Sequence, residues 1–425
     1  MNNNYNIRNE ENKSTEIVMN PVKSGENLQD LICFSHLRWN LVFQRPQHLL
    51  TRWAKELRVF YFEEPVFEAN ISNYLELNIN KDHPNIHILT PHLRPGLKEI
   101  QINALLHDYV NTFIRLNRVT DFLLWYLTPM ALPFSHHLKA KTVVYDCMDE
   151  LSCFKGAHPL MLQHESMLMK FADTVFTGGH SLYEHKKNWH FNIYPFPSSI
   201  DKAHFESGIK SKDPDDQNLI PHPRVGFYGV IDERMDIGLL DGLARKMNDF
   251  HFILIGPVVK IDYKDLPKHE NIHYLGGKKY EELPAYLAHW DVAFLPFAKN
   301  DSTKFISPTK TPEYLCAGKP VVSTSIHDVI DPYGISGLVQ IADSVNDFSE
   351  AIMYAMKQKD DQQWKNKTKE FLSTNSWDLT YAKMKKIILD TLEKKDTLNV
   401  RSHRILTETM ADNERHGSDV KIRIL

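Results

Sequence analysis

The chain has 425 residues, which is enough for two or three domains of ordinary size and excludes a small scaffold stapled by disulfides or metal. Hydrophobic residues make up 42% and charged residues 24% of it, a balance typical of a soluble globular protein and not of collagen, a coiled-coil rod or a wholly disordered chain. The 50 Lys and Arg side chains against 54 Asp and Glu leave a formal net charge of −4, so we expect no nucleic-acid partner.

Cysteine usage and apolar runs indicate the compartment. The four cysteines form no CxxC pair and no Cys/His pair at ligand spacing, which favours free thiols over a disulfide framework or a zinc site. The N-terminus has no basic stretch followed by an apolar core, so we expect no signal peptide. The longest apolar stretch, residues 122–134, contains two prolines and is shorter than the ~20 residues that a membrane span requires. We therefore expect a cytoplasmic protein.

The first half of the chain alternates short apolar runs with amphipathic stretches. Residues 1–28 are polar, and we expect them to form a disordered tail. Short runs that are rich in β-formers predict buried strands at residues 31–34, 59–62, 86–89, 122–126, 142–145 and 174–177. Helical periodicity lies between several of them, for example around residues 49–57 and 160–171. The alternation predicts an α/β domain with a parallel, Rossmann-like sheet over residues 29–205.

A second α/β domain follows. Residues 206–223 are polar and end in two prolines, which is typical of an inter-domain linker. Beyond them, strands are predicted at residues 225–229, 252–255, 272–275, 292–295, 320–323 and 337–339, and helices at 237–247, 281–289, 312–317 and 346–357. We expect this Rossmann-like domain to span residues 224–376. The amphipathic segment 377–392 could pack on either half, and we expect it to return to the first; residues 396–425 are charged and aperiodic and are expected to be mobile.

Ligands in open α/β sheets bind beyond the carboxyl ends of the strands, and the second half has two candidate positions there. Gly229 lies at the end of a predicted strand, just before a helix. This arrangement can bind an anion, but glycine is also common in ordinary turns between strand and helix. Arg234, five residues later, could bind a phosphate or be a solvated surface charge. The second is a loop and short helix whose candidate ligand-binding side chains are Lys304, Ser307, Thr309, Lys310 and Glu313.

The placement of Glu313 rests on the predicted start of that helix. Thr311 is a credible N-cap with Pro312 at the first helical position, which puts Glu313 in the first turn, where it could simply complement the helix dipole. Two lysines, three hydroxyl residues and the Gly229 turn converge on the same edge, however. A ligand that carries phosphate and sugar hydroxyls accounts for all of them.

The first half supplies candidates for the opposite side of a cleft. Asp146 and Asp149 follow the predicted strand 142–145, and either could be a general base or merely cap a turn. Candidate acceptor or cleft residues follow the first strand or begin the next helix: His36, Arg38, Trp39 and Arg45. Trp39 could stack on a sugar or pack in the core, and Arg45 could meet a phosphate or be solvated.

Other chemistry gains no support. Asp213 and Asp215 form a DxD sequence, but it lies in the disordered-looking linker with no strand before it, which favours a solvated turn. We therefore predict no metal. No motif places a histidine beside Ser181 or Ser307, so hydrolase chemistry is not indicated.

Several of these segments resemble a known family. Residues 229–322, with their loop, Glu313 and the Gly-Lys-Pro-Val-Val sequence at 318–322, resemble the donor-binding half of GT-B glycosyltransferases, in particular the family-4-like branch (glycosyltransferase group 1). In the first half, residues 34–40, 44–48, 145–150 and 196–201 resemble bacterial envelope-polysaccharide glycosyltransferases of the teichuronic-acid type. The resemblance spans about residues 29–393. It implies the GT-B fold, in which two Rossmann-like domains face each other across a cleft.

The resemblance also implies roles for particular residues. Glu313 would accept hydrogen bonds from the donor ribose, with Thr309 and Lys310 beside the diphosphate, and the loop 277–279, which contains Lys278, would read the base, commonly uracil. The family pattern has a further glutamate eight positions earlier, where this chain has Phe305. The family's Arg and Lys after the strand-end glycine fall on Val230 and Met235, with Arg234 and Lys304 the nearest substitutes.

The function implied is a hexosyltransferase-type glycosyltransferase that uses a nucleotide sugar, with UDP as the expected nucleotide, and an envelope polysaccharide or lipid-linked glycan as acceptor. Two alternatives stay open: a UDP-sugar 2-epimerase-like isomerase, which needs no acceptor, and a non-catalytic nucleotide-sugar-binding subunit, for which Phe305 is the only hint. Apolar spacing over residues 97–119 is compatible with peripheral membrane contact through the first half, or with an ordinary core-packed helix.

Overall fold

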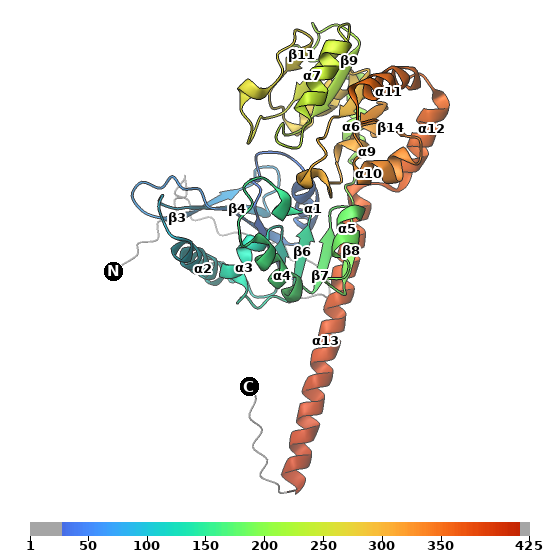
Figure 1. The fold of residues 1–425 in the computed structure, drawn as a ribbon. Coiled ribbons are helices and arrows are strands. Elements are labelled where there is room, and N and C mark those ends of the chain that lie inside the picture. The colour runs from blue at the N-terminus through green and yellow to red at the C-terminus, as the bar shows by residue number, and fades with distance from the viewer. Residues whose placement is uncertain (1–27, 417–425) are drawn as a thin grey trace. The chain divides into compact units, whose positions relative to one another are not determined.

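A computed structural model describes residues 28–416 of the chain (Figure 1). The expected N-terminal tail falls on residues 1–27, which lie outside the described part together with residues 417–425. Within the described residues the chain builds two open sheets in succession, the first from β1 to β8 and the second from β9 to β14.

The first sheet has eight strands in the order β3-β4-β2-β1-β5-β6-β7-β8. Its strands are β1 (Asp30–Ser35), β2 (Arg58–Glu63), β3 (Tyr74–Ile79), β4 (Ile86–His92), β5 (Phe122–Tyr126), β6 (Thr142–Cys147), β7 (Thr174–Thr177) and β8 (Ile193–Pro195). All pairs are parallel except that β3 runs antiparallel to β4. Strands β1, β5 and β6 are buried along their whole length, which explains their continuous apolar runs.

Five described helices accompany this sheet: α1 (Arg45–Trp53), α2 (Glu99–Leu116), α3 (Leu132–Ser135), α4 (Met161–Phe171) and α5 (His180–Lys186). Helix α6 (Lys202–Ser207) follows and packs on the second domain, where its Phe205 belongs to the hydrophobic core. The apolar face of α2 is used for core packing, since Leu106, Tyr109, Val110 and Phe113 are all buried. The apolar spacing over residues 97–119 therefore belongs mainly to the core. No described helix combines the length and the apolar character that crossing a membrane requires.

The second sheet has six parallel strands in the order β11-β10-β9-β12-β13-β14. They are β9 (Arg224–Tyr228), β10 (His251–Ile255), β11 (Ile272–Tyr274), β12 (Val292–Leu295), β13 (Val321–Ser323) and β14 (Val339–Ile341). This is the 3-2-1-4-5-6 order of dinucleotide-binding folds, in which the order reverses between the first and fourth strands, here β9 and β12. Ligands of such sheets bind near that reversal.

The helices of the second half are α7 (Ile237–Lys246), α8 (Leu283–Ala288), α9 (Lys310–Cys316), α10 (His327–Val329), α11 (Val345–Gln358) and α12 (Gln362–Phe371). Helix α9 begins at Lys310, earlier than expected, so Thr311 is not its N-cap. The buried Thr311 hydroxyl has no hydrogen-bond partner among the described residues. Glu313 nevertheless lies in the first turn, as expected.

The polar segment 206–223 is packed and not disordered. Gln217 is fully buried, donates a hydrogen bond to the Tyr286 carbonyl (3.2 Å) and accepts one from the Trp290 indole (2.9 Å). Asp213 forms an ion pair with the buried Arg224 (2.7 Å). These buried polar contacts hold the segment against the second domain.

The chain ends its described part in one long helix, α13 (Trp377–His416). The stretch that we expect to be mobile, residues 396–425, is helical as far as His416. No glycine or proline interrupts residues 377–416, and Gly417 follows directly.

The start of α13 contacts α1. The Trp377 ring stacks on His48, with centroids 4.6 Å apart, and Arg52 pairs with Asp378 at 2.7 Å. The Tyr381 hydroxyl donates a hydrogen bond to Glu56 (2.8 Å). Residues from Ala382 onward form a second unit, described by itself as helix as far as His416. The packing of residues 382–392 stays a prediction.

Candidate active site

Two glycine turns meet at the carboxyl ends of β9 and β10. Gly229 has φ +144° and Gly256 has φ +147°, backbone conformations that favour glycine. A Cβ on Gly256 would lie 1.8 Å from the Gly229 carbonyl oxygen, so the two backbones approach more closely than any side chain would permit. The turns therefore leave an unobstructed backbone surface at the point where β9 reverses the strand order.

Lys310 lies against this surface. A Cβ on Gly229 would stand 2.3 Å from the Lys310 Cε and 2.9 Å from its Nζ. The ammonium group makes no hydrogen bond or ion pair to any residue of the described part. Burial, and to a smaller extent the nearby Arg234, lower the pKa of Lys310 to about 8, while Glu313 and two aspartates act in the opposite direction. The ammonium lies 5.7 Å from the centre of the Phe227 ring and Lys310 is only partly exposed, and a cation held there without a carboxylate partner is suited to an anionic ligand.

Glu313 is the carboxylate of the same cluster. It is only 6% exposed, and its Oε2 accepts a hydrogen bond of 2.6 Å from the Tyr228 hydroxyl at the end of β9. The neighbouring Tyr314 hydroxyl accepts a hydrogen bond from the Tyr228 backbone N–H (2.9 Å). Burial raises the pKa of Glu313 to about 7, with the Tyr228 hydroxyl and Lys310 opposing the shift. The helix-dipole interpretation alone does not explain why the chain buries this carboxyl.

Arg234 is the second cation near the glycine turns. Its Nη2 donates to Asp232 (2.7 Å), its Nε donates to both oxygens of the same carboxylate, and its guanidinium lies 5.4 Å from the centre of the Phe154 ring. Nη1 makes no hydrogen bond within the described part. Arg234 is therefore held in place with one donor free.

The other predicted donor-side residues lie elsewhere or make little contact. The Lys278 ammonium pairs with Asp216 (2.6 Å). Lys304 is exposed and lies over the Phe305 ring, 5.2 Å from its centre. The Ser307 carbonyl accepts a weak bond from Ser198 (3.3 Å), and Thr309 precedes α9 without a capping hydrogen bond. The structure thus brings Gly229, Lys310, Glu313 and Arg234 together, and gives the other two lysines other partners.

Asp146 and Arg45, predicted as base and cleft residue, neutralise each other in the core. Asp146 is completely buried, and its carboxylate accepts from Arg45 Nη2 (2.7 Å) and Nε (3.0 Å). Arg45 Nη1 donates to the Phe196 carbonyl (2.6 Å). Neither side chain is free for substrate, which corrects the sequence-based expectation for both.

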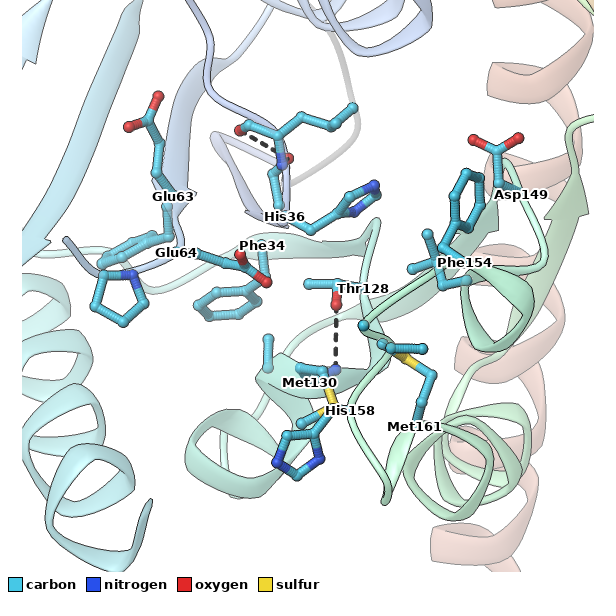
Figure 2. A pocket seen from close by; sticks show the side chains of 18 of the residues that line it. Phe34, His36, Glu63, Glu64, Thr128, Met130, Asp149, Phe154, His158 and Met161 are labelled. Atoms are coloured by element: carbon cyan, nitrogen blue, oxygen red, sulfur yellow. Dashed lines mark hydrogen bonds between the residues drawn. The ribbon is translucent and has the colours of Figure 1, made fainter. Parts of the chain in front are cut away.

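Asp149, in contrast, faces the cavity. It follows β6, lines the cavity described below, and its carboxylate makes no hydrogen bond to any described residue. Burial raises its pKa, while Arg234, Arg45 and Lys310 oppose the shift. Figure 2 shows Asp149 at the edge of the pocket next to Phe154. The two predicted bases therefore differ: one is an ion-pair partner and the other a free carboxylate beside two cations of the opposite domain.

Of the residues predicted after β1, only His36 lines the cavity. Burial lowers the pKa of His36 to about 4, opposed by a hydrogen bond to the Leu127 backbone, so its imidazole is neutral at physiological pH. Arg38 pairs with Glu63 (2.9 Å). Trp39 is 6% exposed and packs edge-on against Tyr61, which favours packing in the core, one of its two interpretations, over stacking on a sugar.

The cavity has a volume of about 750 Å³ and is lined by residues that follow β1, β2, β5, β6, β9 and β10 (Figure 2). Sequence reasoning missed several of its residues, among them Glu64, Thr128, Phe154 and Lys260. Glu64 is the second residue after the predicted strand 59–62 and could have been found by its position. Phe154 and Lys260 carry no such signal, because they come together only when both domains are present.

The DxD sequence has structural partners. Asp213 pairs with Arg224, as noted above, and Asp215 pairs with Lys212 (2.9 Å). Within residues 28–416, no three His, Cys, Asp or Glu side chains are grouped so that they could hold a metal ion.

Comparisons with known proteins agree with this geometry. Residues 223–358 match the family described as Glycosyl transferases group 1. Over 282 residues the chain is 23% identical to a protein of Bacillus subtilis (strain 168) named as a teichuronic acid biosynthesis glycosyltransferase, TuaH; the match covers 62% of this chain and 70% of that protein.

Solved structures share the architecture. A sucrose-phosphate synthase from Thermosynechococcus elongatus superimposes with a TM-score of 0.66 at 13% identity, over 86% of this chain and 100% of that one. The catalytic domain of starch synthase IV from Arabidopsis thaliana, bound to ADP and acarbose, gives 0.61 at 10% identity, over 87% and 100%. The chain is therefore a glycosyltransferase with the GT-B fold, whose residues 223–358 match the glycosyl transferases group 1 family.

Proposed function

We propose that this protein transfers a sugar from a nucleoside diphosphate sugar, with UDP as the nucleotide, to a hydroxyl of a cell-envelope glycan. The observation that carries the proposal is the convergence of Lys310, Glu313 and the glycine turns close to Arg234, which lines the same cavity as Asp149. The name of the Bacillus subtilis relative supports an envelope polysaccharide or its lipid-linked precursor as acceptor.

The donor would lie across the carboxyl ends of β9 and β10. Its diphosphate fits against the Gly229 and Gly256 turns, where Lys310 and the free Nη1 of Arg234 supply positive charge. Its ribose hydroxyls would donate to the Glu313 carboxylate, which Tyr228 holds in place. The loop 276–279, which follows β11, is the nearest backbone for reading the base; uracil is our proposal for it.

The acceptor hydroxyl would approach Asp149. A carboxylate that is free of hydrogen bonds and whose pKa is raised by burial is a suitable general base, since proton transfer is most efficient when the pKa lies near the working pH. Arg234 and Lys310 act on Asp149 electrostatically, so the base lies close to the cations that would hold the diphosphate. This arrangement supports inversion with Asp149 as base.

The cavity supports transfer over the open alternatives. An epimerase needs space only for its nucleotide sugar, whereas this chain has a cavity of about 750 Å³ whose walls come largely from the first domain. A subunit without chemistry would need no unpaired carboxylate at its edge. All four cysteines are free thiols, which supports a reducing, cytoplasmic location.

The test is an assay of UDP release with a panel of UDP-sugars and a mixture of lipid-linked envelope glycans. Release that depends on acceptor supports transfer. Deuterium exchange into a UDP-sugar without acceptor would instead support the epimerase, and UDP binding without turnover over the whole panel would support a binding subunit.

A further inference from the structure

One wall of the cavity is apolar although it faces open space. Phe67, Ile102, Met130, Phe134, Phe154 and Met161 line the cavity and are each partly or largely exposed. In Figure 2, Met130 and Met161 lie on the side of the pocket opposite His36, with Phe34 nearby. Partly exposed apolar side chains that share one concave surface are characteristic of a ligand site and not of a random surface.

Several polar groups of the cavity already have partners. Glu63 accepts from Arg38, Thr90 and the Trp39 backbone N–H. Thr128 accepts from the Met130 backbone N–H, at 3.3 Å. The lining carboxylates without hydrogen bonds to described residues are those of Glu64, Glu99 and Asp149; Glu99 lies 3.9 Å from the His158 ring. Sugar hydroxyls would find partners at these carboxylates and at His158, which Figure 2 shows beside Met130, whereas the two methionine side chains offer apolar surface.

Apolar side chains are also exposed at the mouth of the cavity. Leu41 and Phe67 line the cavity and are 63% and 47% exposed. A purely hydrophilic oligosaccharide would leave this surface in contact with water, whereas an apolar group would cover it. Covering apolar surface is favourable in proportion to its area.

We infer that the acceptor is amphiphilic: it carries an apolar chain, alkyl or polyisoprenyl, that lies along the Met130–Met161 wall while its sugar hydroxyl reaches Asp149. This inference rests on the proposed function, because it takes the cavity to be the acceptor site. The chain could be anchored in a membrane or dispersed in water, and the chemistry of recognition is the same in both cases.

The test compares octyl β-D-glucoside, below its critical micelle concentration, with methyl β-D-glucoside by isothermal titration of the full chain, with and without saturating UDP. We expect the octyl compound to bind at least about tenfold more tightly, since its chain covers surface that the methyl group cannot reach. Met130→Gln and Met161→Gln replace an apolar side chain by a polar one of similar size. Each should weaken the binding of octyl glucoside roughly three- to tenfold and leave the affinity for methyl glucoside unchanged.

Met167→Gln is the matched control. Met167 lies on α4 with Met161, is 51% exposed and does not line the cavity, so its replacement should change neither affinity. Equal affinity for the two glucosides, including no detectable binding of either, would overturn the inference. So would octyl binding that survives the Met130→Gln/Met161→Gln double substitution. Failure of UDP to bind contradicts the proposed donor site instead and is read separately.

Co-sedimentation with vesicles shows whether the apolar chain of the acceptor is held in a membrane or dispersed in water. Co-sedimentation with phosphatidylcholine vesicles only when they contain a glucosyl diacylglycerol supports the inference with a membrane-held acceptor. Octyl binding without co-sedimentation supports it with a dispersed amphiphile. Equal sedimentation with plain vesicles would show that the protein adsorbs to lipid nonspecifically. It would contradict the inference that the cavity binds the apolar chain of the acceptor.

Discussion

Lys310 occupies the space that a side chain at position 229 would need: a Cβ on Gly229 would stand 2.3 Å from the Lys310 Cε. The two residues are far apart in sequence and come from different βα units of the second sheet. Their contact places an unpaired ammonium on a glycine turn, and it is the basis for assigning the diphosphate to this place.

Replacing Gly229 by Ala should therefore expel the Lys310 side chain from the turn. The loss of a charge-assisted contact to phosphate corresponds to roughly 10- to 150-fold weaker UDP binding. Isothermal titration of UDP measures it, with the thermal midpoint as a check on folding because φ at Gly229 is +144°. Gly238→Ala in α7 is the control: the nearest atom to its Cβ would be an Asp236 oxygen at 3.5 Å, and UDP affinity should not change.

Asp149→Asn and Asp146→Asn should fail in different ways. Asp149 makes no hydrogen bond that its replacement would break, so we expect a normal thermal midpoint and a fall in kcat of about 10²- to 10⁴-fold, the usual range for loss of a general base. Asp146→Asn leaves the buried Arg45 without its partner charge and should cost about 3–5 kcal/mol of stability. If Asp149→Asn retains more than about a tenth of the activity, the inverting base is refuted and a retaining mechanism is preferred.

Donor binding should depend on pH with a maximum near neutrality. Burial raises the pKa of Glu313 to about 7, so its carboxylate is lost as the pH falls through this value; burial lowers the pKa of Lys310 to about 8, so its charge is lost as the pH rises. Loss of either charge weakens the binding of UDP-glucose. The ligand itself does not titrate in this range, because its diphosphate is esterified at both ends. In Glu313→Gln the acid limb of the binding profile should disappear and the basic limb should remain. An unaltered acid limb would show that a group other than Glu313 causes it and would contradict the prediction.

Activity should not require a divalent cation. Lys310 and Arg234 supply positive charge where the diphosphate would leave, which is the role that a metal ion has in other transferases. Turnover measured in EDTA and in added Mg²⁺ or Mn²⁺ should agree within about twofold, a difference too small for loss of a Lewis acid. A loss of activity in EDTA that Mg²⁺ restores would contradict this prediction.

The sheets could be predicted from the sequence wherever both faces of a strand are buried. The six strands predicted in the first half correspond to β1, β2, β4, β5, β6 and β7. The two that were missed are of other kinds: β3 is a half-exposed antiparallel edge strand, and β8 has only three residues, one of them a proline. Neither presents the continuous apolar run on which the prediction depends.

The candidate site was predictable in part. Strand-end position identified Gly229 and Asp149, because the topology brings strand ends together, and the predicted helix start identified Glu313. It did not separate Asp149 from Asp146, since only the fold shows that Arg45 meets Asp146, 101 residues away in the chain. The same limit explains Lys278, whose partner Asp216 lies in a segment that composition alone marked as a linker.

The central claim, that Glu313 belongs to a nucleotide site, is tested most directly by titrating UDP against the wild-type chain and Glu313→Ala, with the exposed Glu370→Ala as control. A helix-dipole partner would contribute only about 0.3–1 kcal/mol to stability and nothing to binding. A carboxylate that accepts hydrogen bonds from the ribose makes charge-assisted bonds. Its loss should weaken the binding of UDP and of UDP-sugars alike, by roughly 10- to 150-fold. Unchanged UDP affinity in Glu313→Ala would contradict the account and remove the donor site built around it.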